Sequence, residues 1–373
     1  MEKKSKIYIA GHNGLVGSAI HRNLIAKGYK NFVLTPFPPY DLTDQKTVAD
    51  FFSKEKPDYV ILAAAKVGGI LSNNKYRAQF IYENLMIENN IIHQSYVNGV
   101  KKLLFLGSSC IYPANCPQPI KEEYLLTGEL EYTNEPYAVA KISGIKMCES
   151  YNIQYGTNFI SVMPTNLYGP NDNYNLETSH VLPALIRKMH LGKCLENNDW
   201  ESIRKDFKKN PVEGRNENST DAEILAILGK YGIQPATSNQ QPVTISLWGT
   251  GNPYREFLYV DDLADACVYV MNHVDFNNLK AHNPEPHALS SVTSAHIKNT
   301  HINIGTGMDL TIKELALIIK DTVGFKGQLE WDSSKPDGTY RKLLDVSKIN
   351  NLGWTEKVSL EDGIKMIYNM YRI

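Results

Sequence analysis

Residues 6–17 read KIYIAGHNGLVG and contain the transition that decides the fold. The apolar run at residues 6–10 has the length and composition of a short buried strand. Glycines at positions 11, 14 and 17 follow at once, and residues 18–26 carry apolar side chains at helical spacing. In this order of strand, glycine-rich turn and helix, backbone amides and a helix N-terminus can hold a pyrophosphate. The pattern therefore predicts dinucleotide binding; the alternative is a tight turn without a ligand.

Strand and helix patterns continue to alternate through the first half of the chain. Further strands are expected at residues 31–34, 58–62, 102–106 and 159–163, and helices at 44–54, 73–97 and 135–155. Repeated βα units predict an α/β fold with a doubly wound parallel sheet.

Two domains are expected from this pattern. We expect residues 1–166 plus about 253–275 to form the dinucleotide-binding domain. A smaller α/β substrate domain would comprise residues 167–252 and 276–373. Residues 193–242 are highly polar and are interpreted as an insertion. We favour an insertion that only decorates the surface, a surface ornament, over one with a direct role in substrate binding.

Composition narrows the class of function. The chain has 373 residues and a formal net charge of -1, which favours neither a nucleic-acid nor an anionic-membrane partner. No apolar run approaches the ~20 residues of a membrane span, and the first residues lack a signal-peptide core. Five scattered cysteines indicate reduced thiols in a cytoplasm, with no disulfide framework and no metal site.

Tyr137 and Lys141 stand four residues apart, one turn along the helix expected at 135–155. That spacing directs a phenol and an ammonium into the same space. A neighbouring cation favours the phenolate, so we expect Lys141 to lower the pKa of Tyr137 from about 10 towards neutrality. Taken alone, the same spacing also arises by chance on surface helices.

Residues 106–113, LGSSCIYP, directly follow an expected strand. Ligands of a doubly wound sheet bind outside the carboxyl ends of its strands. Ser108 could share a carbonyl oxygen with Tyr137 there, while Lys141 holds a ribose. Together with the glycine loop, these residues predict hydride transfer at a carbonyl group and outweigh a plain capping role for Ser108.

With these residues in place, the chain resembles the GDP-L-fucose synthase family, extended short-chain reductases with a Rossmann domain. The resemblance is carried by GHNGLVGSAI (11–20), GSSCIYP (107–113), NEPYAVAKISGIKMCESYN (134–152), MPTNLYGPND (163–172), SHVLPAL (179–185), WGTGNPYREFLYVDDLA (248–264), INIGTG (302–307) and KPDGTYRKLLDVSKI (335–349). It spans nearly the whole chain except roughly residues 193–242 and 276–300.

The resemblance implies an NADPH-dependent homodimer that epimerises a GDP-linked 4-keto-6-deoxy sugar at C3 and C5 and then reduces C4. GDP-4-keto-6-deoxy-mannose, which gives GDP-L-fucose, is the default substrate; a heptose equivalent for surface polysaccharide is an open variant. Cys110 matches the family's catalytic cysteine and is the expected base, and His180 is the expected acid. Ser108 and Tyr137 would steady the enolate oxygen. The implied catalytic set is Ser108, Cys110, Tyr137, Lys141 and His180.

The same resemblance implies two binding sets. The cofactor set is Gly11, Asn13, Gly14, Leu15, Val16, Gly17, Asp41, Leu42, Ala63, Ala64, Ala65, Lys141, Pro164, Asn166, Leu167 and His180. The substrate set is Ser108, Ser109, Cys110, Tyr137, Asn166, Lys188, Trp248, Arg255, Asp337 and Lys342. Two departures concern these sets. Lys188 stands where the family has an arginine, and residues 35–41 offer neither a clean acidic residue for NAD nor an arginine for NADP. For Trp248, stacking on guanine and packing in a core are both open.

Other functions stay open from the sequence. One alternative is a GDP-sugar 3,5-epimerase that recycles its cofactor, and another is a plain 4-reductase without net epimerisation. A dehydratase would place an Asp-Glu pair where this chain has Ser109 and Cys110. A non-catalytic dinucleotide sensor is disfavoured by the intact set of Ser108, Tyr137 and Lys141.

Overall fold

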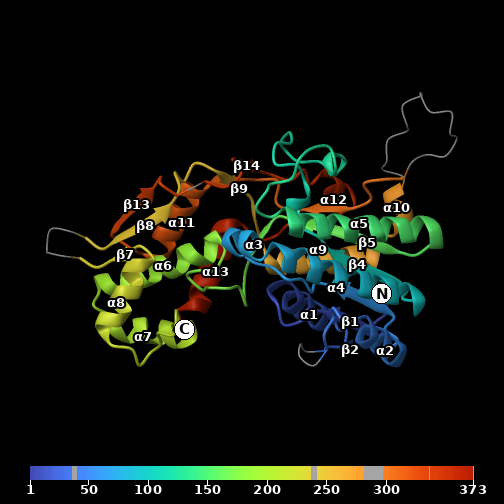
Figure 1. Cartoon of the computed structure of the whole chain (residues 1–373), viewed down its shortest axis with the longest axis horizontal. Coiled ribbons are helices and arrows are strands. Elements are labelled where there is room, and N and C mark those ends of the chain that lie inside the picture. Colours follow the sequence, from blue (N-terminus) through green and yellow to red (C-terminus); the bar gives the residue numbers. More distant parts are fainter. Residues whose placement is uncertain (36–39, 237–241, 281–296, 336, 373) are drawn as a thin grey trace. The chain divides into compact units, whose positions relative to one another are not determined.

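The computed structural model describes the chain except residues 36–39, 237–241, 281–296, 336 and 373 (Figure 1). It divides into two compact units. Unit 1 comprises Met1–Asn171, Glu256–Met308 and Leu343–Val358, and unit 2 comprises Asp172–Arg255, Asp309–Lys342 and Ser359–Ile373. The chain therefore alternates between the units.

Unit 1 is built on a six-stranded sheet with the order β11-β5-β4-β3-β1-β2, and all of its pairings are parallel. The strands are β1 (Ile7–Ala10), β2 (Phe32–Val33), β3 (Tyr59–Leu62), β4 (Lys102–Leu106), β5 (Phe159–Pro164) and β11 (Ile302–Ile304). The order reverses between β1 and β3 relative to the chain, as in a doubly wound fold. The predicted fold class is confirmed.

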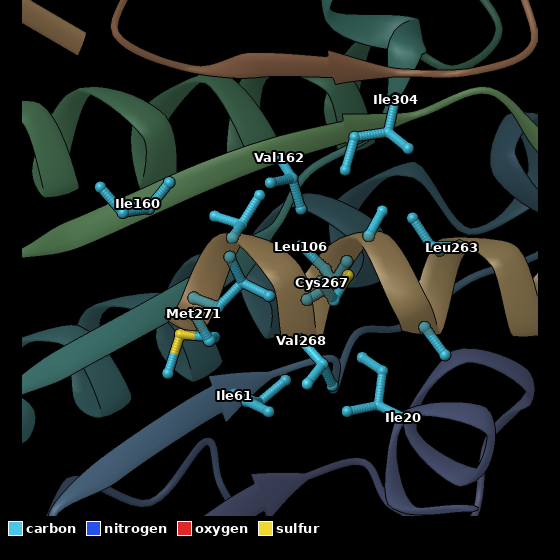
Figure 2. Packing of buried hydrophobic residues seen from close by; sticks show 14 of the residues in the cluster. Ile20, Ile61, Leu106, Ile160, Val162, Leu263, Cys267, Val268, Met271 and Ile304 are labelled. Carbon is cyan, nitrogen blue, oxygen red and sulfur yellow. The ribbon is translucent and has the colours of Figure 1, made fainter. Parts of the chain in front are cut away.

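Helices cover both faces of this sheet. α1 (Leu15–Ala26) and α9 (Val260–His273) pack on one face, and α2 (Gln45–Glu55), α4 (Arg77–Val97) and α5 (Glu135–Tyr155) pack on the other. Alternate strand residues serve the two faces: Ile61 lies in the α1/α9 core and Val60 in the α2/α4/α5 core. Figure 2 shows the first core, where Cys267 and Met271 of α9 lie against the strands.

Several expected elements have different bounds in unit 1. α1 begins at Leu15 and not at residue 18, because Gly14 occupies the N-cap position without any side-chain signal. The helix expected at 73–97 is two helices, α3 (Ile70–Lys75) and α4, since Tyr76 leaves helical geometry with φ -110° and ψ 36°. Smaller elements of unit 1 are η1 (Ser109–Ile111), η2 (Glu122–Tyr124), β6 (Asn166–Tyr168), β10 (Phe257–Tyr259), α10 (Phe276–Lys280) and α12 (Ser347–Asn351).

The C-terminal part of unit 1 differs from the expected domain segments. Residues up to Met308 and residues 343–358 belong to unit 1, although we assigned them to the substrate domain. The physical reason is that β11 pairs with β5 as an edge strand of the sheet. Lys348 of α12 then donates to the carbonyl oxygens of Asn299 and His301 beside β11.

Unit 2 contains two small sheets and five helices among its described residues. One sheet has the order β13-β8-β7 and the other β12-β9-β14. The strands are β7 (Ile233–Gln234), β8 (Thr244–Trp248), β9 (Tyr254–Arg255), β12 (Leu310–Thr311), β13 (Gln328–Asp332) and β14 (Arg341–Lys342), and the helices are α6 (Val181–Glu196), α7 (Trp200–Lys209), α8 (Asp221–Lys230), α11 (Ile312–Val323) and α13 (Leu360–Tyr371).

The insertion at 193–242 is an integral part of unit 2 and not an ornament on its surface. Arg187 of α6 is fully buried and donates twice to Asp206 of α7, at 3.0 and 2.8 Å. Its remaining N–H groups reach the carbonyl oxygens of Tyr174 and Asn210. The hydroxyl of Tyr371 in α13 also donates to Asp206. This network ties the insertion to two helices outside it.

Candidate active site

The glycine loop after β1 forms a cradle of closely packed backbone, which leaves no room for a Cβ at Gly11 or Gly17. Gly11 has φ +84°, and a Cβ there would lie 2.7 Å from the backbone nitrogen of Ala64. A Cβ on Gly17 would lie 2.1 Å from the carbonyl oxygen of Gly11. Gly14 is the N-cap of α1 and uses no side chain as a cap. The first amides of α1 have no side-chain cap, and such amides at a helix N-terminus are suited to a dinucleotide pyrophosphate.

The neighbouring loop after β3 is held by a buried asparagine. Ala63, Ala64 and Ala65 directly follow β3. The Asn84 side chain of α4 accepts a hydrogen bond from the amide of Lys66 at 2.9 Å and donates to its carbonyl oxygen at 3.1 Å. Because Asn84 is completely buried, this loop is firmly positioned beside Gly11.

The segment after β2 is described only in part. Residues 35–41 bear on the choice between NAD and NADP, and residues 36–39 of this segment lie outside the described residues. Asp41 accepts hydrogen bonds from the amide and hydroxyl of Thr43, and the carbonyl oxygen of Leu42 accepts one from Asn90. Asp41 and Leu42, which are predicted to bind the cofactor, thus lie in the turn that leads into α2.

The turn after β4 carries Ser108, Ser109 and Cys110. Ser108 is the N-cap of η1, and its hydroxyl accepts a hydrogen bond from the Cys110 amide at 3.4 Å. Ser109 and Cys110 are buried. The preceding Gly107 allows a close approach, since a Cβ there would lie 2.3 Å from the sulfur of Met163. Ser108 therefore has a capping contact at the carboxyl end of β4, where it can also face a ligand.

Tyr137 and Lys141 lie on α5, as predicted, but the electrostatics differ from the sequence argument. Lys141 lies over the Tyr137 ring with its Nζ 5.7 Å from the ring centre. Loss of hydration, Cys110 and Glu88 raise the pKa of Tyr137 well above its usual 10. The expectation that Lys141 lowers this pKa is wrong for the structure as it stands. A phenol with a raised pKa stays protonated at neutral pH and can donate a proton.

The charge of Lys141 is compensated by a different residue. Its Nζ lies 3.0 Å from Oε1 of Glu88 on α4, and both side chains are almost completely buried. Lys141 also lies 4.8 Å from the centre of the Phe105 ring. The attraction between Lys141 and the Glu88 carboxylate at 3.0 Å is stronger than the attraction between Lys141 and Tyr137, whose ring lies 5.7 Å from the ammonium.

The strand β5 and its continuation bring Pro164, Asn166 and Leu167 to the carboxyl edge of the sheet. Asn166 donates to the carbonyl oxygen of Glu256 at 2.8 Å. The buried Glu256 carboxylate in turn accepts from the amides of Thr306, Gly307 and Leu344. These bonds hold in place the segment that contains the predicted cofactor residue Asn166. The hydrogen-bond donors of the Glu256 carboxylate named here are backbone amides and not cations.

In unit 2, His180 and Lys188 lie on α6. His180 is the N-cap of α6, but its side chain makes no capping hydrogen bond. Helix capping therefore does not explain why an imidazole stands at this position. His180 is an exposed residue. Loss of hydration nevertheless lowers the pKa of its imidazole. Lys188 is buried, donates to the carbonyl oxygen of Ser246 at 3.2 Å, and has a pKa lowered to about 8 by burial.

The remaining substrate-side residues lie on the small sheets of unit 2. Arg255 of β9 and Lys342 of β14 are paired positions of neighbouring parallel strands. Paired positions project to the same side of a sheet. The Arg255 guanidinium donates to the carbonyl oxygens of Tyr254 and Thr339, both at 2.6 Å. Trp248 is 60% exposed, which excludes the core interpretation. Asp337 has both carboxylate oxygens bonded to Thr250, so it holds the turn after β8.

Three residues that contribute to the site were missed from the sequence: Asn84, Glu88 and Glu256. A signal existed for the first two. They lie four residues apart on α4 between apolar positions, which places two polar side chains on its buried face. Glu256 lies between two motif residues, and its backbone amide contacts could not be read from residue types.

Membrane-spanning helices and metal-binding clusters are both absent from the described residues. None of the described helices combines the length and the apolar character that a membrane crossing requires. Within the described part of the chain, no cluster of three or more His, Cys, Asp or Glu side chains is arranged to hold a metal ion.

Known proteins are similar to this chain over most of its length. A family model described as the NAD dependent epimerase/dehydratase family matches residues 7–206 and 213–283. GDP-L-fucose synthase 1 of Arabidopsis thaliana is 50% identical over 370 residues, covering 99% of this chain and 94% of that protein. GDP-L-fucose synthase of Escherichia coli (strain K12) is 46% identical, covering 99% and 97%. A solved GDP-6-OMe-4-keto-L-xylo-heptose reductase from C. jejuni is 46% identical with a TM-score of 0.88, covering 100% of this chain and 99% of that chain. The resemblance read from the motifs is confirmed: the chain belongs to the NAD dependent epimerase/dehydratase family and is similar over nearly its whole length to GDP-L-fucose synthases.

Proposed function

We propose that this protein is an NADPH-dependent enzyme that epimerises a GDP-linked 4-keto-6-deoxy sugar at C3 and C5 and reduces its C4 carbonyl. The observation that carries the proposal is the placement of Tyr137 and Lys141 on α5, against the Ser108–Cys110 turn at the carboxyl end of β4. That placement stands in a chain 46–50% identical to GDP-L-fucose synthases.

NADPH is the proposed cofactor. The cradle of Gly11, Gly14 and Gly17 fits its pyrophosphate, and Lys141 retains N–H groups for its ribose hydroxyls. Two solved relatives, both 45% identical, support the choice: a heptose synthase from Campylobacter jejuni in the presence of NADPH and a C4 reductase with NADP bound. When bound, the cofactor supplies the hydride for C4.

Tyr137 is the proposed acid of the reduction. Its raised pKa keeps the phenol protonated at neutral pH, so it can give its proton to the developing C4 oxyanion. Ser108, one turn from Cys110, donates a hydrogen bond to the same oxygen. Lys141 fixes the cofactor ribose and balances charge below the phenol.

Cys110 and His180 are the proposed base and acid of the epimerisation. A 4-keto group acidifies the protons on C3 and C5, so a base can form an enolate at each centre. Cys110 removes the proton, and His180 returns one from the opposite side. Ser108 and Tyr137 stabilise the enolate oxygen in both steps, which gives these two residues a double role.

Arg255 and Lys342 are the proposed contacts of the GDP diphosphate, since their paired positions place two cations side by side. Lys188 is the proposed third cation, and exposed Trp248 is the proposed stacking partner of guanine. The side chain of Asp337 contributes through the turn that it holds after β8.

A second candidate is a C4 reductase that does not change the C3 and C5 centres. It is favoured by one relative, a GDP-mannoheptose C4 reductase from Campylobacter jejuni, 45% identical with a TM-score of 0.84 over the whole of both chains. The same similarity supports a heptose as the sugar. A hexose is supported by the GDP-L-fucose synthases.

We also propose a cytoplasmic homodimer. α4 and α5 are the longest described helices of unit 1 and expose apolar side chains, namely Tyr82, Val97, Val139, Ile153 and Tyr155. A two-fold axis through these helices would cover them. None of the five cysteines, all of which lie in the described part of the chain, forms a disulfide, which suits a reducing compartment.

The deciding experiment is incubation with NADPH and a GDP-4-keto-6-deoxy sugar in D2O, followed by NMR of the product. Hexose and heptose substrates are compared in parallel. We expect NADPH to be consumed and deuterium to appear at C3 and C5. Reduction without exchange would establish the plain reductase, and exchange without NADPH consumption would establish an epimerase that recycles its cofactor.

Two variants assign the steps. Cys110→Ser should abolish exchange and leave direct reduction of the substrate measurable, because Ser108 and Tyr137 remain. His180→Asn should leave exchange at the carbon that Cys110 deprotonates but block net inversion. Unchanged inversion in both variants would refute the assigned base and acid.

A further inference from the structure

Glu88 is a buried carboxylate inside the layer of helices that carries the reduction residues. It lies on α4, is 1% exposed, and its Oε1 lies 3.0 Å from the Lys141 ammonium. The fit is tight. A Cβ added at Gly144 of α5 would lie 2.9 Å from Glu88 Oε2 and 2.4 Å from the Phe105 ring. α5 therefore needs a glycine at position 144 for Glu88 to enter between the helices.

The reason for a carboxylate at this position lies in the burial of Lys141. An ammonium removed from water reverts to the neutral amine unless an opposite charge compensates it. The rings of Phe105 and Tyr137, 4.8 and 5.7 Å from Nζ, supply only a weak attraction. Among the described residues, Glu88 is the acidic partner that Lys141 contacts.

We propose that Glu88 is a positioning residue for the reduction: it keeps Lys141 in its charged form and fixed over the Tyr137 ring. The inference rests on the proposed function, since it assigns Lys141 to the cofactor ribose. Lys141 has three N–H groups, so the contact with Glu88 leaves donors for the ribose hydroxyls.

Other titratable groups face the pair from neighbouring elements. Tyr137 and Cys148 of α5 and Cys110 of η1 are the groups that interact with Glu88 or with the phenol. Loss of hydration raises the pKa of Glu88, and Lys141 acts against that rise. Loss of hydration also raises the pKa of Cys148 to about 12, so this thiol stays neutral and leaves the Lys141 charge to Glu88.

The test compares Glu88→Gln with a matched control, Glu149→Gln. Glu149 is also a buried glutamate, lies on α5 and pairs with Lys146 at 2.8 Å, but it does not contact Lys141. Turnover and NADPH affinity are measured for both variants and the wild type over about pH 6 to 9, the range in which a desolvated lysine titrates.

In Glu88→Gln, Lys141 loses the charged partner that compensates its buried ammonium. We expect kcat to fall by about tenfold per pH unit on the alkaline side, while the KM for the GDP-sugar stays near that of the wild type. NADPH affinity should weaken over the same range. The profiles of the wild type and Glu149→Gln should coincide, and Glu88→Asp should recover the wild-type limb in part. A Glu88→Gln profile parallel to that of the wild type would overturn the inference, whatever its thermal stability.

A second measurement does not depend on turnover or on a folded Glu88 variant. Lysine-selective nitrogen NMR of the wild type detects buried ammonium groups, and the Lys141→Met variant identifies the Lys141 signal. The ammonium signal should persist to about pH 9. Its loss near neutrality would overturn the role of Glu88 even if the proposed reaction holds. A persistent signal in a protein that reduces no keto-sugar would refute the proposed function and leave the pair intact.

Discussion

Replacing Arg187 by methionine should destabilise unit 2 strongly. The change removes four hydrogen bonds from a fully buried guanidinium: two to Asp206 and one each to the carbonyl oxygens of Tyr174 and Asn210. The Asp206 side chain is only 2% exposed, so it cannot recover hydration without local opening. Removing one partner of a buried ion pair costs about 3–5 kcal/mol, and we expect about 4 kcal/mol for Arg187→Met.

The assay is urea unfolding followed by tryptophan fluorescence. Three of the four tryptophans, Trp200, Trp248 and Trp331, lie in unit 2, so the signal reports mainly on the unit that contains the substitution. The expected result is a lower midpoint with an unchanged slope, because the folded and unfolded surfaces stay similar.

The control removes the rest of the buried polar cluster. Arg187→Met combined with Asp206→Leu and Tyr371→Phe eliminates the stranded carboxylate and its hydroxyl partner. This variant should be more stable than Arg187→Met alone, since an apolar replacement of a whole buried pair is often near neutral. A single substitution that costs under about 1 kcal/mol, or a triple variant less stable than the single, would refute the argument that the insertion is anchored by this charge pair.

Three further predictions concern the site. Gly17→Ala should weaken NADPH binding by at least about tenfold, because its Cβ would lie 2.1 Å from the Gly11 carbonyl oxygen; wild-type affinity by NADPH fluorescence would contradict the cradle. Tyr137→Phe should lower the rate of C4 reduction by about 10²–10⁴-fold, and single-turnover kinetics that match the wild type would remove Tyr137 from the mechanism. Burial raises the pKa of Asp172 from 3.8 to about 6, so its ionisation opposes folding. The unfolding free energy should therefore fall as pH rises from about 4 through about 6, and Asp172→Asn should lessen that fall and be more stable at pH 8 by about 3 kcal/mol; equal pH slopes for the two proteins would exclude Asp172 as a cause.

Much of unit 1 could be predicted because its signals are local. β4 and α5 have the bounds expected from the sequence, since an apolar run is confined to residues 102–106 and Gly156 ends the helix in the left-handed region with φ 68°. β11 could not be predicted in the sheet. It has three residues, and its pairing with β5 depends on contacts far apart in the chain.

The secondary structure around the candidate site could be predicted, but its electrostatics could not. The motifs placed Tyr137 and Lys141 on one helix, and the structure agrees. The partner of Lys141 is Glu88, which lies on another helix. Burial of the phenol, with smaller contributions from Cys110 and Glu88, raises the pKa of Tyr137 and so reverses the expected direction. The pattern of α4 places Glu88 on its buried face, but no spacing within either helix shows that it pairs with Lys141.

The position of β11 also bears on how the protein is made. The chain crosses between the units five times, because three segments of each alternate along it. As the polypeptide leaves the ribosome, β5 emerges long before β11, and at ~5–20 residues per second the delay is on the order of 10 s. During that interval β5 can pair with β4, but its other edge still lacks β11. Such an unpaired edge can recruit the strands of other nascent chains. Neither unit can be isolated by trimming the chain, and a truncation before residue 302 should yield an aggregating product.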